Sequence, residues 1–250
     1  MSQPAPDLAS LYPELGQDGT LQTVLQKAVH QAGYRFEVLP ERAGAWKRTG
    51  ARADSDSRTT NAHLGIQNRC FIMSFWDRGV AMAKGTTTIL NEAAAATGLW
   101  QSGANVEDMA SACPFVHPGP LAEAHERDTA VETKWTIYRQ TAASHVDHDL
   151  IEASYAQPRL RALFPFHSHR SLAFSRCTGF PYTHDAPVVT PVSGRYRVTW
   201  WKSRSPQGPA DIGETDNPRD AVALVVAHLP PEYGAAVAGT ADDLDKSVSA

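Results

Sequence analysis

Histidine is the residue type best able to do chemistry in this chain, and it is concentrated in three places. The chain has 10 histidines among 250 residues. One residue separates His167 from His169, so an extended segment would place both imidazoles on one face. Histidines at this spacing can transfer protons near neutral pH or bind a metal, and they also occur as plain cover on a sheet. We take both as candidate catalytic residues.

A second candidate lies in the proline-containing segment 180–187, Phe-Pro-Tyr-Thr-His-Asp-Ala-Pro. Prolines near both ends would stiffen the segment, and His184 beside Asp185 is a pair able to exchange a proton at neutral pH. A turn with no chemical role has the same composition, so that alternative stays open. We add His184 and Asp185 to the candidate catalytic residues.

The third concentration is the stretch His145-Val-Asp-His148-Asp149. On a helix His145 and Asp149 stand four residues apart and can meet, with His148 beside them. These groups would hold a metal only with a further ligand from elsewhere, and a polar helix end has the same composition. We expect no resident metal or cofactor, and a metal at these three residues stays an open alternative.

Tryptophans next to predicted turns and strands are the best candidates for holding a substrate. Trp76 precedes an Asp-Arg-Gly turn, and Trp200 and Trp201 are adjacent in a predicted strand. Neighbouring strand residues point to opposite faces, so at most one of these two indoles lies in the core. An indole outside the core favours a binding surface. We predict substrate contacts from Trp76, Arg78, Arg176 and Trp200.

Composition excludes several classes of function. The net charge of −4 lacks the basic excess typical of nucleic-acid binding. The first ten residues do not resemble a secretion signal, and no apolar run reaches the roughly 20 residues that span a bilayer. Phosphate-binding, dinucleotide-binding and nucleophile-elbow motifs are missing. We therefore expect a cytoplasmic protein with no nucleic-acid, membrane or nucleotide partner.

Hydrophobic periodicity predicts a mixture of helices and strands. Apolar stripes and capping residues indicate helices over 20–33, 90–100, 105–112, 119–156 and 217–229, and β-prone runs indicate strands over 34–39, 70–76, 80–83, 172–175, 196–200 and 210–213. Polar and proline-rich stretches predict loops over 41–62 and 180–191, and residues 240–250 have the composition of a disordered end.

A short phrase occurs twice, at residues 85–93 and 213–221, each time between a predicted strand and a predicted helix. The two copies share Gly, Thr, an acidic residue and Ala at matching offsets, which favours an internal duplication. Short connections favour antiparallel pairing. The predicted fold is α+β, with hairpin-plus-helix units at 19–118 and 166–240 joined by a helical connector at 119–165, together forming one compact domain.

Several of these segments resemble a known group of proteins. They are the residues 75–76 and 79–87, the Ala-rich helix that runs to Trp100, the residues 112–116 and 172–176, and the closing stretch from 212–215 to 229–231. Over about residues 60–245 the chain resembles an uncharacterised family of bacterial proteins described broadly as natural product biosynthesis proteins. The resemblance implies a gene cluster, one that makes modified peptides, and it carries no known catalytic residues.

The combined prediction is a tailoring or accessory protein of natural product biosynthesis that acts on a ribosomally made peptide. As an enzyme it would assist cyclisation or a similar acid–base step without a cofactor, on a peptide or small-molecule intermediate. The alternatives are a non-catalytic module that binds a peptide or docks another biosynthetic enzyme, and a self-resistance protein that sequesters the product.

Overall fold

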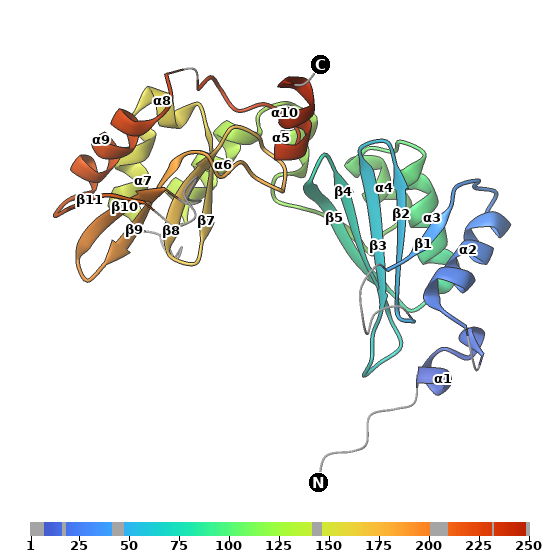
Figure 1. Ribbon diagram of the computed structural model, residues 1–250. Helices are drawn as coiled ribbons and strands as arrows, with labels where there is room; N and C mark the ends of the chain where they lie inside the picture. The colour runs from blue at the N-terminus through green and yellow to red at the C-terminus, as the bar shows by residue number, and fades with distance from the viewer. Residues whose placement is uncertain are drawn as a thin grey trace, which may run out of the picture. The chain divides into compact units, whose positions relative to one another are not determined.

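The chain divides into two compact units, Met1–Glu123 and Ala124–Ala250, here called the N-terminal and C-terminal units. The computed structural model describes residues 8–16, 19–41, 48–141, 147–200, 210–231 and 233–248. Each unit has one antiparallel sheet with helices packed against it, so the predicted α+β class is confirmed (Figure 1). None of the helices in the described ranges combines the length and apolarity that crossing a bilayer requires.

The N-terminal unit is built on a six-stranded sheet in which each strand pairs with the next along the chain. Its strands are β1 (Val38–Pro40), β2 (Gly50–Ser55), β3 (Arg58–Leu64), β4 (Phe71–Asp77), β5 (Val80–Thr87) and β6 (Val116–Pro118). Its helices are α1 (Leu8–Leu11), the short 3-10 helix η1 (Pro13–Leu15), α2 (Leu21–Gln31), α3 (Leu90–Gln101) and α4 (Val106–Ala112), and α5 (Ala122–Glu126) crosses the division between the units. The predicted β4–β5 hairpin is confirmed.

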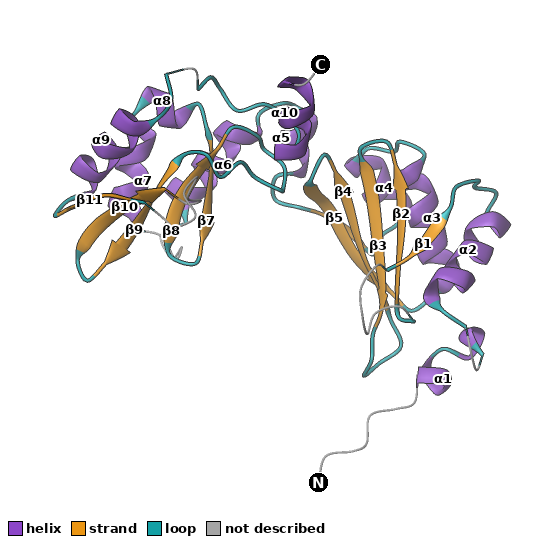
Figure 2. Cartoon of the chain, in the orientation of Figure 1, coloured by secondary structure: helices purple, strands orange, loops and turns teal. Residues whose placement is uncertain are grey.

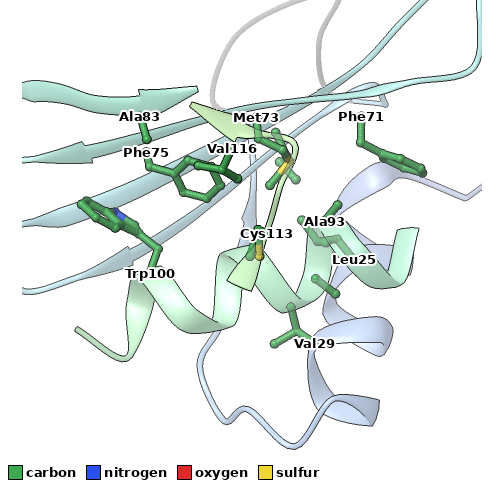
Figure 3. Close-up of a cluster of buried hydrophobic side chains, with 14 of the residues drawn as sticks. Leu25, Val29, Phe71, Met73, Phe75, Ala83, Ala93, Trp100, Cys113 and Val116 are labelled. Atoms are coloured by element: carbon green, nitrogen blue, oxygen red, sulfur yellow. The ribbon is translucent and has the colours of Figure 1, made fainter. Parts of the chain in front are cut away.

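Helices α2 and α3 pack against this sheet and form the core of the N-terminal unit with it (Figure 3). Leu25 and Val29 of α2 are buried at the contact. Trp100 of α3 meets Phe75 of β4 edge-on, with ring centroids 6.0 Å apart. The Thr20 side chain accepts a hydrogen bond from the Thr23 amide and caps α2, which confirms the predicted start of that helix.

The predicted loop over 41–62 is wrong, because strands β2 and β3 occupy residues 50–55 and 58–64. Apart from Leu64, the buried positions of these strands are small residues, including Ala51, Ala53 and Ala62. Strands are normally recognised by large β-branched or aromatic side chains that alternate with polar ones. Alanine is only a weak indicator of a strand, so the polar residues between the alanines led to the prediction of a loop. Residues 42–47 lie outside the described residues.

The C-terminal unit has a five-stranded antiparallel sheet in the order β11-β10-β9-β8-β7, so β7 and β11 are its edges (Figure 2). Its strands are β7 (Phe164–Ser168), β8 (Ser171–Ser175), β9 (Pro187–Val192), β10 (Arg195–Trp200) and β11 (Asp211–Thr215). Its helices are α6 (Ala130–Gln140), α7 (His148–Tyr155), α8 (Pro158–Arg161), α9 (Pro218–His228) and α10 (Ala241–Val248). The Asn217 side chain caps α9, as predicted.

The long helix predicted over 119–156 is instead divided among α5, α6 and α7. Trp135 of α6 and Leu150 of α7 are buried in one core with Phe174 of β8. Helices from the predicted connector at 119–165 therefore help to bury the sheet of the C-terminal unit. The division between the two units also falls inside that segment.

Two further predictions in the C-terminal unit are wrong. The segment 180–191, predicted as a loop, contains most of strand β9, in which Pro187 is the first residue and needs no paired amide donor. Residues 241–248 form helix α10, whereas disorder was predicted from residue 240 onwards. The Thr240 hydroxyl bonds the Asp243 carboxylate and accepts from the Asp243 amide, an arrangement typical of a helix start.

The repeated phrase occupies the same place in both units. In each unit the phrase covers the end of the fifth antiparallel strand, which is β5 in one unit and β11 in the other. A helix follows in both, and its N-cap residue, Ile89 or Asn217, comes at the same position within the phrase. The glycines differ in their surroundings. A Cβ on Gly85 would lie 2.7 Å from a backbone oxygen of Phe115, whereas Gly213 meets only a side-chain methyl at 3.3 Å. An origin by duplication stays a prediction.

Candidate functional site

Helix α6 and edge strand β7 bring Tyr138 and His167 together. His167 pairs across the strands with Leu172, a residue of the helix-covered core, so its ring lies on that face. The Tyr138 hydroxyl is 2.8 Å from Nδ1 of His167. A phenol can donate to bare Nδ1 or accept from Nδ1–H, so this hydrogen bond can persist in both protonation states of the imidazole. Burial raises the pKa of Tyr138, which keeps the phenol protonated.

Lys134 lies one helical turn before Tyr138 on α6. Its Nζ atom is 4.7 Å from the ring centroid of Tyr138 and 5.8 Å from that of Phe164. Phe164 and His167 are on opposite faces of the edge strand β7, and α6 contacts Phe164 through Lys134 and His167 through Tyr138. Burial lowers the pKa of Lys134 because the surroundings disfavour a charged ammonium. Its described contacts are with these two rings.

A group of five aromatic rings extends from Lys134 to the surface, and we call it the aromatic cluster. Its members are Tyr138, Phe164, Phe166, Phe180 and Tyr182. The ring of Tyr182 is 4.6 Å from Phe166, 5.6 Å from Phe164 and 5.9 Å from Phe180 between centroids. Phe180 is 62% exposed. A flat apolar group could therefore contact this cluster from the solvent side.

The segment that carries Tyr182 also holds the predicted pair His184 and Asp185. The ring of His184 meets Phe166 edge-on at 5.8 Å. Arg176 donates from Nε to Oδ2 of Asp185 over 2.9 Å, and burial of this carboxylate is outweighed by those hydrogen bonds, so the pKa of Asp185 is lowered. An ionised carboxylate held by an arginine suits fixing the segment better than donating a proton.

Hydrogen bonds at its base fix this segment further. The buried Ser175 hydroxyl accepts from the amide of Thr183, and the Thr183 hydroxyl accepts from the amide of Arg176. On the other side, residues 233–241 run beside it, and the amides of Thr178 and Gly179 donate to carbonyls in that stretch. These hydrogen bonds tie the segment that carries Phe180 and Tyr182 to the chain beyond α9.

The structure does not bring the remaining predicted residues of the C-terminal unit to this place. His169 lies in the exposed turn after β7 with φ at +54°, so the strand alternation that would align it with His167 ends before it. Trp200 is half-buried on β10, which β8 and β9 separate from β7. His148 and Asp149 are exposed in the first turn of α7, and His145 lies outside the described residues.

Trp76 and Arg78 belong to the N-terminal unit. Trp76 is half-buried on β4, alternating with buried Phe75, and its Nε1 atom donates to the Ser74 hydroxyl over 3.0 Å. The neighbouring Ile72, on the same face, is 45% exposed. Arg78 is exposed in the β4–β5 turn with φ at +45°. This face of the sheet therefore carries Trp76 and Ile72 among polar side chains, which include Asn61, Ser74 and Lys84.

Sequence reasoning missed Lys134, Tyr138 and Tyr182. In the sequence Tyr138 shares an apolar helical stripe with Val131 and Trp135, a pattern typical of core packing, and a lysine on such a helix normally extends into solvent. Only the pairing of β7 at the sheet edge brings Phe164 against the same helix turn. Within the described residues, no three side chains of His, Cys, Asp or Glu come together as a metal site would need.

Comparison with known proteins adds one finding. Residues 129–240 match a family of unknown function, DUF6193. This range contains Lys134, Tyr138, His167 and all of the aromatic cluster. The expected resemblance to an uncharacterised family is thus supported over this part of the chain. No curated protein and no solved structure matches the chain.

Proposed function

We propose that the C-terminal unit performs an acid–base step on a peptide or small-molecule intermediate of natural product biosynthesis, with His167 as the proton-transfer group. The observation that carries this proposal is the hydrogen bond between the buried Tyr138 hydroxyl and Nδ1 of His167. It orients an imidazole that is itself exposed. The biosynthetic setting rests on the family resemblance alone.

Ring closure of a peptide is the reaction class we favour. The attacking group must lose a proton and the leaving group must gain one, and one imidazole can serve both steps in turn. Nε2 must be bare to accept a proton, so Nδ1 of the neutral ring carries a hydrogen, and the Tyr138 hydroxyl accepts it in both protonation states. His184 beside Phe166 is the candidate for a second proton-transfer group, and Arg176 for a substrate contact. The predicted catalytic roles of His169 and Asp185 stay predictions.

The test is mass spectrometry of products in a strain that lacks this gene and is complemented with variants. We expect His167→Gln to accumulate an unprocessed intermediate, with turnover reduced by about 10²-fold or more, as for loss of a general acid–base group. Tyr138→Phe keeps the imidazole but loses its orientation, so we expect a smaller loss. His228→Gln, which removes an exposed histidine of α9, is the matched control and should complement fully.

Complete complementation by a folded His167→Gln variant would overturn the catalytic proposal. A variant that yields normal products at lower amounts would favour an accessory role instead. Folding of each variant is checked by circular dichroism, because Tyr138 also contributes to the core.

A second function is favoured by a different observation, the surface around Trp76 and Ile72 on β4. As a binding module the N-terminal unit would hold an extended peptide, dock a partner enzyme, or sequester a product there. Trp76→Ala should then abolish peptide binding while His167→Gln leaves it unchanged. The opposite pattern, lost turnover with retained peptide affinity in His167→Gln, would favour the enzyme.

A further inference from the structure

Lys134 has an environment that is unusual for a lysine. Its ammonium group lies against the rings of Tyr138 and Phe164, and it forms no ion pair among the described residues. The α6 residues three and four positions away, including Ala130, Val131 and Ile137, are apolar or aromatic and cannot supply a carboxylate. Lys134 is half-buried, and a cation partly removed from water without an anion is costly, so such a group is favourable for an anionic ligand.

The remaining contacts around Lys134 define the ligand's chemistry. The Tyr138 hydroxyl, which bonds His167, is the nearby polar group carried by the same helix. Beyond it the surface is aromatic, through Tyr182 to the exposed ring of Phe180. Faces and edges of such rings favour contact with another flat ring. One cation at the inner end and rings at the outer end match a molecule with one negative charge on an aromatic body.

We propose that Lys134 and the aromatic cluster form a subsite for an aromatic carboxylic acid. The carboxylate lies at Nζ of Lys134, and the aromatic body packs on Tyr182 and Phe180. This proposal rests on the proposed function, because it names the substrate class of the site at His167. An intermediate with an aromatic residue and a free carboxylate, such as a peptide ending in one, fits this chemistry.

Binding of an anion also has a consequence for protonation. Burial lowers the pKa of Lys134, and a bound carboxylate would favour the ammonium again. Binding at a pH where the lysine is partly neutral should therefore take up protons. Calorimetry in two buffers of different ionisation enthalpy measures this uptake directly, and the uptake should vanish in Lys134→Met.

The experiment titrates the full chain with benzoate and, separately, with benzamide, its neutral analogue of the same shape. We expect benzoate to bind at about millimolar Kd and benzamide at least about tenfold more weakly. Lys134→Met should weaken benzoate at least about tenfold, while Lys134→Arg keeps the charge and most of the affinity. Lys246→Met, which removes an exposed lysine of α10, should have no effect.

Three results would overturn the subsite: no benzoate binding at about 10 mM, equal binding of benzoate and benzamide, or unchanged benzoate affinity in Lys134→Met. His167→Gln separates this proposal from the proposed function, since it should lose turnover and still bind benzoate. Loss of turnover in His167→Gln together with unchanged benzoate affinity in Lys134→Met would leave acid–base chemistry standing and remove the aromatic acid as its substrate.

Discussion

Gly98 of α3 lies so close to the ring of Tyr34 that a Cβ at position 98 would be 2.1 Å from the ring atom Cε2. Two effects oppose each other in Gly98→Ala. Alanine favours the helix by about 1 kcal/mol, whereas overpacking costs about 1–3 kcal/mol. Three ring atoms lie within 2.4 Å of the added carbon, so we expect the clash to dominate. Urea unfolding should show a net loss of stability of up to about 2 kcal/mol.

A double-mutant cycle isolates the ring contact. In a Tyr34→Ala background the clash is absent, so Gly98→Ala should become neutral or stabilising by up to about 1 kcal/mol. The same loss in both backgrounds would show that the ring is not its cause.

Asp185→Asn should change how stability depends on pH. Burial disfavours the Asp185 carboxylate, but hydrogen bonds from Arg176, and to a smaller extent from Tyr233 and Thr183, outweigh burial and lower its folded-state pKa. The ionised carboxylate therefore stabilises the folded protein at pH values above the ordinary aspartate pKa of about 3.9. This stabilisation is lost as the pH falls through the lowered pKa of the folded state. The side chains of Arg176 and Asp185 are about a third exposed, at 32% and 34%. We therefore expect Asp185→Asn to lower the free energy of unfolding by at most about 1 kcal/mol at pH 7.

The measurement is urea unfolding of both proteins between acid and neutral pH. The difference in unfolding free energy between the two proteins should shrink once the pH falls below the ordinary aspartate pKa, and it should vanish in strong acid. Asp211→Asn is the exposed comparison: a hydrogen bond from Arg197 also lowers the pKa of Asp211, but both side chains are about half exposed, at 47% and 56%, so its pH-dependent difference should be smaller. A pH-independent difference for Asp185→Asn would mean that its role is not electrostatic.

Helix ends and hairpins were predictable because their determinants are local. Thr20, Asn105 and Asn217 accept hydrogen bonds from amides three residues ahead, as their positions before apolar stripes indicated. The Asp-Arg-Gly turn defined the β4–β5 hairpin in the same way. Each feature depends on contacts within a few residues, so one sequence suffices to locate it.

The site was less predictable because its contacts are long-range. His167 was a candidate from its spacing to His169, yet its bonded partner, Tyr138, is 29 residues away in sequence. Strands β2 and β3 were missed for a related reason. Ala51 and Ala62 become a buried face only when α3 packs on the sheet, and alanine carries no strand signal by itself.

Lys134→Met should stabilise the protein while removing the proposed anion site. Burial lowers the folded-state pKa of Lys134, so the folded state binds this proton less well than the unfolded state. Lys134 therefore destabilises the folded protein fully at pH values below its lowered folded-state pKa. This destabilisation disappears as the pH rises towards the unfolded-state pKa of about 10.4. We expect methionine to add about 0.5–2 kcal/mol at pH 7.

Thermal unfolding of the two proteins at pH 7 and near pH 10 checks this sign. The advantage of the methionine variant should be larger at pH 7. Lys246→Met again serves as the control, since Lys246 is exposed on α10. A methionine variant less stable than the parent at both pH values would show that the lysine stem, through its packing on the rings, matters more than the buried charge.

Val237→Pro tests whether the chain after α9 fixes the segment that carries Phe180 and Tyr182 of the aromatic cluster. The Val237 amide donates to the carbonyl of Arg176, and its carbonyl accepts from the amide of Thr178. Its side chain is 49% exposed, so the backbone is what matters at this position. Proline removes the donor, and we expect a loss of about 1–3 kcal/mol. Hydrogen exchange at Thr178 and Gly179 should accelerate.

Val237→Ala is the matched variant that keeps the amide. Trimming an exposed side chain should change stability by no more than about 0.5 kcal/mol and leave exchange at Thr178 slow. If the two variants behaved alike, the backbone pairing would not hold the segment. If proline accelerates exchange and also weakens benzoate binding while alanine does neither, the position of Tyr182 and Phe180 depends on residues 233–241, and the subsite requires the chain beyond α9.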